Sequence, residues 1–171
     1  FTMGASRREP GRRANEVLHP VSLRRMFYLQ TTEVTNAQFR QFAPGHDSGQ
    51  VDGVSLNGDR QPAVQVSWQQ AAAFCNWLSA KEGLPPFYTV QGARVTGFTA
   101  ASRGYRLPTE AEWAWAAIVQ ADGSSARFGW GQALPPSAKA GNFADQSGAT
   151  LLGQVIAGYD DNHQGGSWLC V

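Results

Sequence analysis

The sequence contains few cysteines, no long apolar run and almost no net charge, and each shortage excludes a class of protein. Two cysteines among 171 residues cannot build the disulfide framework of a small secreted domain. The longest apolar runs are far shorter than the ~20 residues that a membrane-spanning helix needs. The formal net charge of +1, from 14 basic and 13 acidic residues, argues against a nucleic acid as the main partner, because neutralising phosphates takes a clear excess of Lys and Arg.

The composition that is present is typical of one loop-rich globular domain. The 171 residues are 42% hydrophobic, with 19 glycines and 9 prolines and no internal repeat, and this length is enough to bury a core. We therefore expect a single domain over residues 1–171. No charged segment followed by an apolar one marks a targeting signal near the first residue, so the bacterial cytoplasm and the periplasm both stay open.

Positive charge concentrates in the first 25 residues, which hold six arginines and two glutamates. This pattern indicates either a solvated loop whose arginines reach carboxylates elsewhere or a site for an anionic partner. We favour the loop, because charge runs are usually solvated faces. The arginines are Arg7, Arg8, Arg12, Arg13, Arg24 and Arg25.

Three short helices are predicted by the capping box, in which a Ser or Thr side chain accepts a hydrogen bond from the N–H three residues later and a Glu or Gln there bonds back. The three pairs are Thr35 with Gln38, Ser67 with Gln70, and Thr109 with Glu112. The helix after Ser67 is the strongest prediction, because alanines at 71–73 favour helix and Gly83 supplies its end.

One face of that helix carries apolar residues at the i, i+3, i+4, i+7 spacing of a buried stripe. The stripe consists of Ala71, Phe74, Cys75 and Leu78, with Trp77 beside it. Since Cys75 lies on the stripe, we interpret it as a small buried hydrophobe rather than a metal ligand or a nucleophile.

Short strands are predicted at residues 20–30, 87–95 and 151–156, each bounded by turn residues. A few helices with scattered short strands predict an α+β fold with long surface loops. Residues 44–62 are the clearest polar connector.

Six phrases occur in a fixed order along nearly the whole chain. They are FTMG at 1–4, FYLQTTEVTNAQF at 27–39, QPAVQVSWQQAAAFCNWL at 61–78, GYRLPTEAEWAWAA at 104–117, FGWG at 128–131 and GGSWLC at 165–170. Together they resemble the formylglycine-generating enzyme family, also called sulfatase-modifying factors. The resemblance implies a C-type-lectin-like fold with few short helices, small twisted sheets and much irregular structure. We interpret most of these phrases as structural, with Trp113 and Trp115 as buried anchors.

Two loop segments, GNFAD at 141–145 and GYDDN at 158–162, offer the hard oxygen ligands that calcium prefers. They look like the two calcium-binding segments of the family, although ordinary turn residues would give the same pattern. By this match the side chains of Asn142 and Asp161 and the carbonyl oxygens of Phe143 and His163 would bind the ion.

The GGSWLC phrase would hold the reactive centre. In catalytic members of the family, its cysteine and a second one a few residues later hold copper(I), a soft ion that thiolates suit. The metal activates oxygen, and a cysteine in an unfolded sulfatase segment becomes formylglycine. The match implies Cys170 as the first copper ligand and Ser167 as the active-site serine, with Trp168 beside them.

The sequence departs from the family pattern near its end. The second copper cysteine and the closing strand are missing after Val171, and the stretch with the family's GNxxEW phrase is missing after about residue 163. Either segments have been skipped or the copy is degenerate. We favour skipped segments, because losing core strands would expose apolar surface that a small domain can hardly spare.

Three functions remain open. The first is a copper oxidase acting on an unfolded cysteine-containing peptide or protein. The second is a non-catalytic lectin-like binding or regulatory module for a protein, peptide or glycan, using loops 44–62 and 132–150. The third, a related oxidase of a small molecule, is the weakest, because iron relatives need a histidine cluster and His19, His46 and His163 show no ligand spacing. The oxidase is slightly ahead of the binding module, since Cys170 occupies the informative position.

Overall fold

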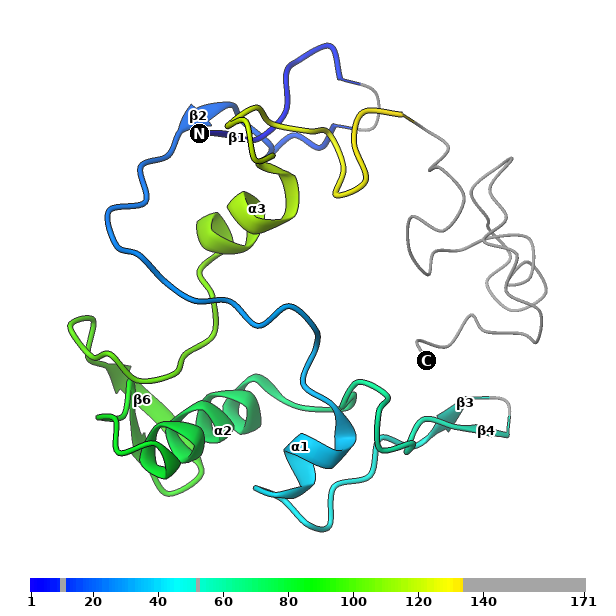
Figure 1. The fold of residues 1–171 in the computed structure, drawn as a ribbon, viewed down its shortest axis with the longest axis vertical. Helices are drawn as coiled ribbons and strands as arrows, with labels where there is room; N and C mark the ends of the chain where they lie inside the picture. Colours follow the sequence, from blue (N-terminus) through cyan, green and yellow to red (C-terminus); the bar gives the residue numbers. More distant parts are fainter. Residues whose placement is uncertain (10–11, 52, 134–171) are drawn as a thin grey trace. The chain divides into compact units, whose positions relative to one another are not determined.

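The computed structural model describes residues 1–9, 12–51 and 53–133, and these fall into two compact units. The first unit comprises Phe1–Leu29 and the described residues from Pro108 on, and the second comprises Gln30–Leu107. Short helices and two-stranded sheets alternate with irregular segments in both (Figure 1). This is the irregular α+β architecture that the sequence predicts. The expectation of one domain over residues 1–171, with segments skipped, stays a prediction.

The first unit is built around a small antiparallel pair, β1 (Thr2–Met3) and β2 (His19–Pro20), and the helix α3 (Glu110–Ile118). The α-amino group of Phe1 donates a hydrogen bond to the Val21 carbonyl at 3.0 Å and extends this pairing. Helix α3 packs against β1. The chain's first residues therefore hold the third predicted helix in place.

Arginines of the first unit bond within it. The Nε of Arg12 donates to the carbonyl oxygens of Ala5 and Glu16 at 3.2 and 3.0 Å, and Arg127 lies 3.4 Å from the Glu9 carboxylate. Of the six arginines near the first residue, Arg12 thus bonds to backbone carbonyl oxygens of its own unit, and the choice between a solvated loop and an anionic site stays a prediction.

The second unit contains the helices α1 (Asn36–Arg40) and α2 (Trp68–Lys81) and two hairpins. The hairpins are β3 (Gln50–Val51) with β4 (Val54–Ser55), and β5 (Tyr88–Gln91) with β6 (Arg94–Phe98). Helix α2 packs on the β5–β6 hairpin (Figure 1). Ala72, Cys75 and Tyr88 form the buried core of this contact.

All three predicted capping boxes are confirmed. In each, the Ser or Thr side chain accepts from the N–H three residues on, and the side chain there accepts from the backbone N–H of the N-cap. Helix α2 ends at Lys81, and Gly83 follows with a φ of 67°, a left-handed conformation that only glycine adopts without strain. Local hydrogen bonding therefore fixes where the helices begin and end.

The strand prediction for residues 20–30 is wrong beyond Pro20. Val21 still exchanges backbone hydrogen bonds with Phe1 at 2.8 and 3.0 Å, but residues 21–30 belong to no strand of the described structure. A strand needs a neighbour along its length for its N–H and C=O groups. Residues 87–95 belong instead to the β5–β6 hairpin, which turns at Gly92 with a φ of 61°. The predicted strand at 151–156 lies outside the described residues.

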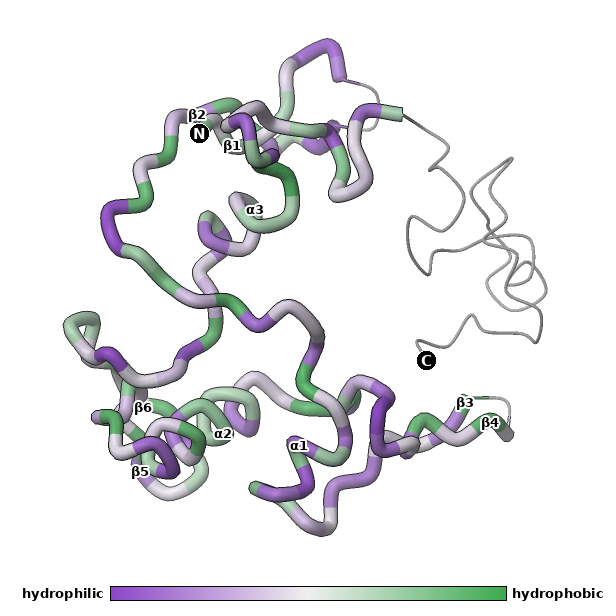
Figure 2. The backbone as a smooth tube through the Cα atoms, viewed as in Figure 1, coloured by the Kyte–Doolittle hydropathy of each residue, from purple (hydrophilic) through white to green (hydrophobic). Residues whose placement is uncertain are grey.

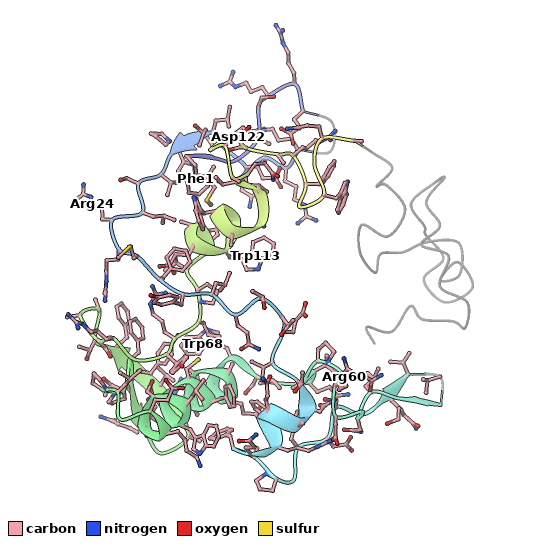
Figure 3. The ribbon with its side chains drawn as sticks, in the orientation of Figure 1. Phe1, Arg24, Arg60, Trp68, Trp113 and Asp122 are labelled. Carbon is pink, nitrogen blue, oxygen red and sulfur yellow. The ribbon has the colours of Figure 1, made fainter. Side chains whose placement is uncertain are left out.

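The expectation that both tryptophans of α3 are buried is also wrong. Trp113, labelled in Figure 3, is 63% exposed. Trp115 is 42% exposed, although it makes an edge contact with Phe27 at 5.9 Å between ring centroids. Hydrophobic residues occur along both units (Figure 2), and several large ones stay exposed. No helix of the described residues is long and apolar enough to cross a membrane.

Candidate functional site

The residues that the sequence puts forward as catalytic or metal-binding lie outside the described residues. They are Ser167, Trp168 and Cys170 for catalysis and copper, and Asn142, Phe143, Asp161 and His163 for calcium. Their roles stay predictions. Within the described ranges, no three His, Cys, Asp or Glu residues gather as a metal site would require.

The interpretation of Cys75 as a buried hydrophobe is confirmed. Its side chain lies in the core with Ala72 and Tyr88, and burial raises the pKa of the Cys75 thiol to about 11. A thiol with this pKa is protonated at neutral pH, whereas copper(I) binds the thiolate. Cys75 therefore does not fit the role of a second copper ligand.

Two histidines bond locally rather than to each other. The Nδ1 of His19 lies 2.8 Å from the Val17 carbonyl. The Nε2 of His46 lies 3.1 Å from Ser48 Oγ, and its ring makes an edge contact with Phe39. Neither arrangement has the shape of an iron site.

A groove of about 300 Å³ lies in the second unit, where α1, α2 and the segment before α1 meet. This volume is at the lower end of the range of ligand sites. Its lining residues are Gln30, Val34, Gln38, Gln41, Phe74, Trp77, Leu78 and Lys81. The groove therefore combines an apolar wall, three amide side chains and one cation.

The apolar wall is held by stacked rings. Phe74 is buried and stacks on Trp77 at 5.6 Å between centroids, with an interplanar angle of 28°. Phe39 and Phe42 of the α1 region contact Phe74 at 5.3 and 5.9 Å. Aromatic pairs of this kind add about 0.5–1.5 kcal/mol each beyond their buried area. The wall is therefore a rigid part of the contact between the two helices.

The amide groups come from α1 and the segment before it. The Oε1 of Gln38 accepts from the Thr35 N–H at 2.9 Å within the capping box, which leaves the Nε2 donor of Gln38 for a ligand. Gln41 follows three residues later on the same side of α1 and is exposed. Each amide offers two donors and an acceptor, so together they match a ligand that carries both kinds of group.

The cation is Lys81, in the last turn of α2. Its Nζ lies over the Trp77 ring at 5.3 Å from the centroid, and no ion pair involves it among the described residues. The neighbouring Glu82 is engaged elsewhere, because its carboxylate hydrogen-bonds the Tyr105 hydroxyl and raises the pKa of that phenol. Within the described ranges, the positive charge at the groove therefore has no acidic partner.

Loop 44–62, which the sequence proposes as a binding loop, is anchored by side-chain hydrogen bonds. Asn57 is the hub: its Nδ2 donates to Asp47 Oδ1 at 2.6 Å, and its Oδ1 accepts from Arg40 at 2.7 Å and from the Ser48 N–H at 2.9 Å. The Asn57 hydrogen bond lowers the pKa of Asp47. The loop thus bonds to α1 through Arg40, whereas the groove is lined by Gln38 and Gln41. A role of the loop in ligand binding stays a prediction.

Sequence reasoning missed the groove although its signals are present. Gln38 and Gln41 are three residues apart, and Phe74, Trp77 and Lys81 follow the i, i+3, i+7 spacing of one helix face. The glutamine pair belongs to the α1 region, and the aromatic and basic residues belong to α2. They form one site only because the two helices pack together. That meeting is a tertiary fact that neither pattern contains.

The comparisons with known proteins define the family. The family of the sulfatase-modifying factor enzyme 1-like domain (FGE-sulfatase) matches residues 1–166. The chain belongs to this family, as the six phrases of the sequence indicate.

Two individual proteins are similar over shorter stretches. The chaperone protein LppX of Paenibacillus barcinonensis is 31% identical over 105 residues, which are 53% of this chain and 35% of that protein. The structure of Treponema denticola variable protein 1 covers 60% of this chain and 44% of its own, at 29% identity and a TM-score of 0.47. The chain thus spans about a third of the length of the one and under half of the other.

Proposed function

We propose that this chain is a non-catalytic binding or regulatory module on a C-type-lectin-like fold, and that the α1–α2 groove contacts its ligand, a protein, peptide or glycan. The groove carries this proposal. It sets an aromatic wall against exposed amides and a cation that has no ion-pair partner among the described residues. An apolar surface with a few convergent polar groups is the usual composition of a ligand site.

The family and one relative add support. Binding and regulatory modules occur on this fold beside the oxidases, and they keep the framework phrases without the metal pair. The similar protein from Paenibacillus is named a chaperone protein. That name supports a binding role for this domain. Since the similarity spans 35% of the relative, nothing is inferred from the remainder of that protein.

The copper oxidase is the second candidate, and the resemblance of the GGSWLC phrase, which implies Cys170 as the first copper ligand, is what favours it. It needs a second thiolate, and Cys75 does not fit, because it is buried and its thiol pKa is raised to about 11. A calcium ion held by Asn142, Phe143, Asp161 and His163 is compatible with either function and would stabilise the fold.

A binding assay with two ligand classes tests the proposal. We would immobilise the full chain and measure binding of reduced, carboxymethylated α-lactalbumin, a permanently unfolded protein, and of a glycan array. We expect one class to bind and Trp77→Ala to weaken it at least tenfold, which corresponds to about 1.4 kcal/mol. Gln41→Ala, which removes an exposed amide of the groove without touching the aromatic wall, should weaken it too.

Trp113→Ala, at an exposed tryptophan of the other unit, is the matched control and should bind as the unmodified chain does. Binding of neither class, or equal binding by all variants, would contradict the proposal. Copper-dependent oxygen consumption with a cysteine-containing peptide, abolished by Cys170→Ser, would show an oxidase instead.

A further inference from the structure

We infer that the ligand of the α1–α2 groove is an extended polypeptide segment that carries a carboxylate beside an apolar side chain. This inference rests on the proposed function and names the ligand class of the same site. Three features of the groove lead to it: the placing of its amides opposite an apolar wall, the neighbours of Trp77, and a cation for which the described part of the chain supplies no acidic partner.

The amides and the wall fit an extended chain. A polypeptide in extended conformation directs successive side chains to opposite sides and leaves its N–H and C=O groups free along its edges. Gln38 and Gln41, one turn apart on α1, offer donors and acceptors to such an edge. An apolar side chain of the ligand would then lie against Trp77 and Leu78 on the opposite wall. With a volume of about 300 Å³, the groove takes a short stretch of chain.

The neighbours of Trp77 argue against a glycan. A sugar ring binds a tryptophan by lying flat on its face. Phe74 already stacks on this indole at 5.6 Å, and the Lys81 ammonium lies over it at 5.3 Å. The protein's own groups therefore take up ring area that a sugar would need, while the remaining edge of the ring suits an aliphatic side chain.

The cation specifies a carboxylate. Lys81 makes no ion pair in the described part of the chain, and Glu82 bonds to Tyr105. The aromatic contact holds the ammonium at the groove, since a cation over an indole is attracted by the ring. An Asp or Glu side chain, or a chain terminus, would complement this charge, and the gain would fall with salt because the ammonium is exposed.

Peptide titrations test the inference. The probes are fluorescein-labelled eight-residue peptides of Leu, Val, Pro and Ser with one central Asp, and the same peptides with Asn or Lys in its place. We expect the best Asp peptide to bind at least fivefold more tightly than its Asn counterpart at low salt, and the Lys counterpart to bind more weakly still. Raising the salt concentration should reduce the preference.

A charge series on the protein assigns the preference to one residue. Lys81→Gln should abolish the difference between Asp and Asn peptides, and Lys81→Arg should keep it. Arg103→Gln, which removes another exposed positive charge of the same unit, should leave it unchanged. Because Lys81 is exposed, these variants should fold normally, and a circular dichroism spectrum checks this.

The outcomes separate the inference from the function on which it rests. Peptides that bind without preferring an acid, or a preference that survives Lys81→Gln, would overturn the inference and leave the binding module standing. Binding of glycans alone through Trp77 would do the same. Binding of neither peptides nor glycans would overturn both.

Discussion

Asn36 and Ser48 are both fully buried, and the Ser48 hydroxyl donates to Asn36 Oδ1 at 2.7 Å. The Nδ2 of Asn36 donates in turn to the carbonyl oxygens of Leu56 and Gly58 at 2.8 and 2.9 Å. One side chain at the first turn of α1 thereby satisfies three groups of loop 44–62. The pair fixes the helix whose glutamines line the groove.

Removing this side chain should destabilise the protein. Asn36→Ala removes the partner of two half-buried carbonyl oxygens and of the buried Ser48 hydroxyl, and a fully buried polar group that loses its partner costs about 1–3 kcal/mol. We expect the free energy of unfolding, measured by urea titration, to fall by about 2–4 kcal/mol. Gln91→Ala, at an exposed polar residue of β5, should change it by less than about 0.5 kcal/mol. Equal stability of the two variants would refute the role of the network.

Gly104 is expected to tolerate no side chain. A Cβ there would meet the Pro85 carbonyl oxygen and would lie 2.7 Å from Ser79 Oγ, the atom that accepts from the Tyr105 N–H at 2.8 Å. Gly104→Ala should lower the free energy of unfolding by about 1–3 kcal/mol through overpacking. Gly45, whose Cβ position is open, gives the control, and Gly45→Ala should be nearly neutral. A neutral Gly104→Ala variant would contradict this packing.

The buried thiol predicts a pH dependence of stability. Burial raises the Cys75 pKa from 9.0 to about 11. Above pH 9 the unfolded thiol loses its proton while the folded one keeps it, so the free energy of unfolding should fall between about pH 9 and 11. Denaturant titrations should show a shallower fall for Cys75→Ala. Tyr88, whose pKa burial also raises, contributes to the slope that remains. Identical slopes would argue against a buried Cys75.

Calcium removal tests the metal proposal. If Asn142 and Asp161 help to hold the ion, an excess of EGTA should lower the melting temperature, because a ligand bound only by the folded state stabilises it by about 2.7 kcal/mol at a hundredfold excess over its dissociation constant. Calcium should restore the melting temperature, and Asp161→Asn should abolish the response to both. A melting temperature that does not change on addition of EGTA would contradict the proposed calcium site.

The features that the sequence predicts correctly are local. The three capping boxes and the buried position of Cys75 depend on residues a few positions apart, so short-range spacing is enough to identify them. The six sequence phrases also predict the family correctly, since the family matches residues 1–166.

The features that it misses depend on distant partners. The pattern of residues 20–30 predicts a strand, but in the described structure the β1–β2 pairing continues only to Val21, through its hydrogen bonds with Phe1. Trp113 was expected to be buried on the basis of its size and is exposed. The groove arises only where α1 meets α2 through Phe39, Phe42 and Phe74. Pairing, burial and helix packing are tertiary properties, and a single sequence pattern does not contain them.

The location of the ligand is the central claim, and a nuclear magnetic resonance titration tests it most directly. The ¹⁵N-labelled chain would be titrated with the best-binding Asp peptide while the side-chain amides of Gln38 and Gln41 and the indole N–H of Trp77 are followed. The account predicts that these three signals shift together and saturate with the same dissociation constant. Shifts that leave all three unmoved while other parts of the chain respond would contradict it.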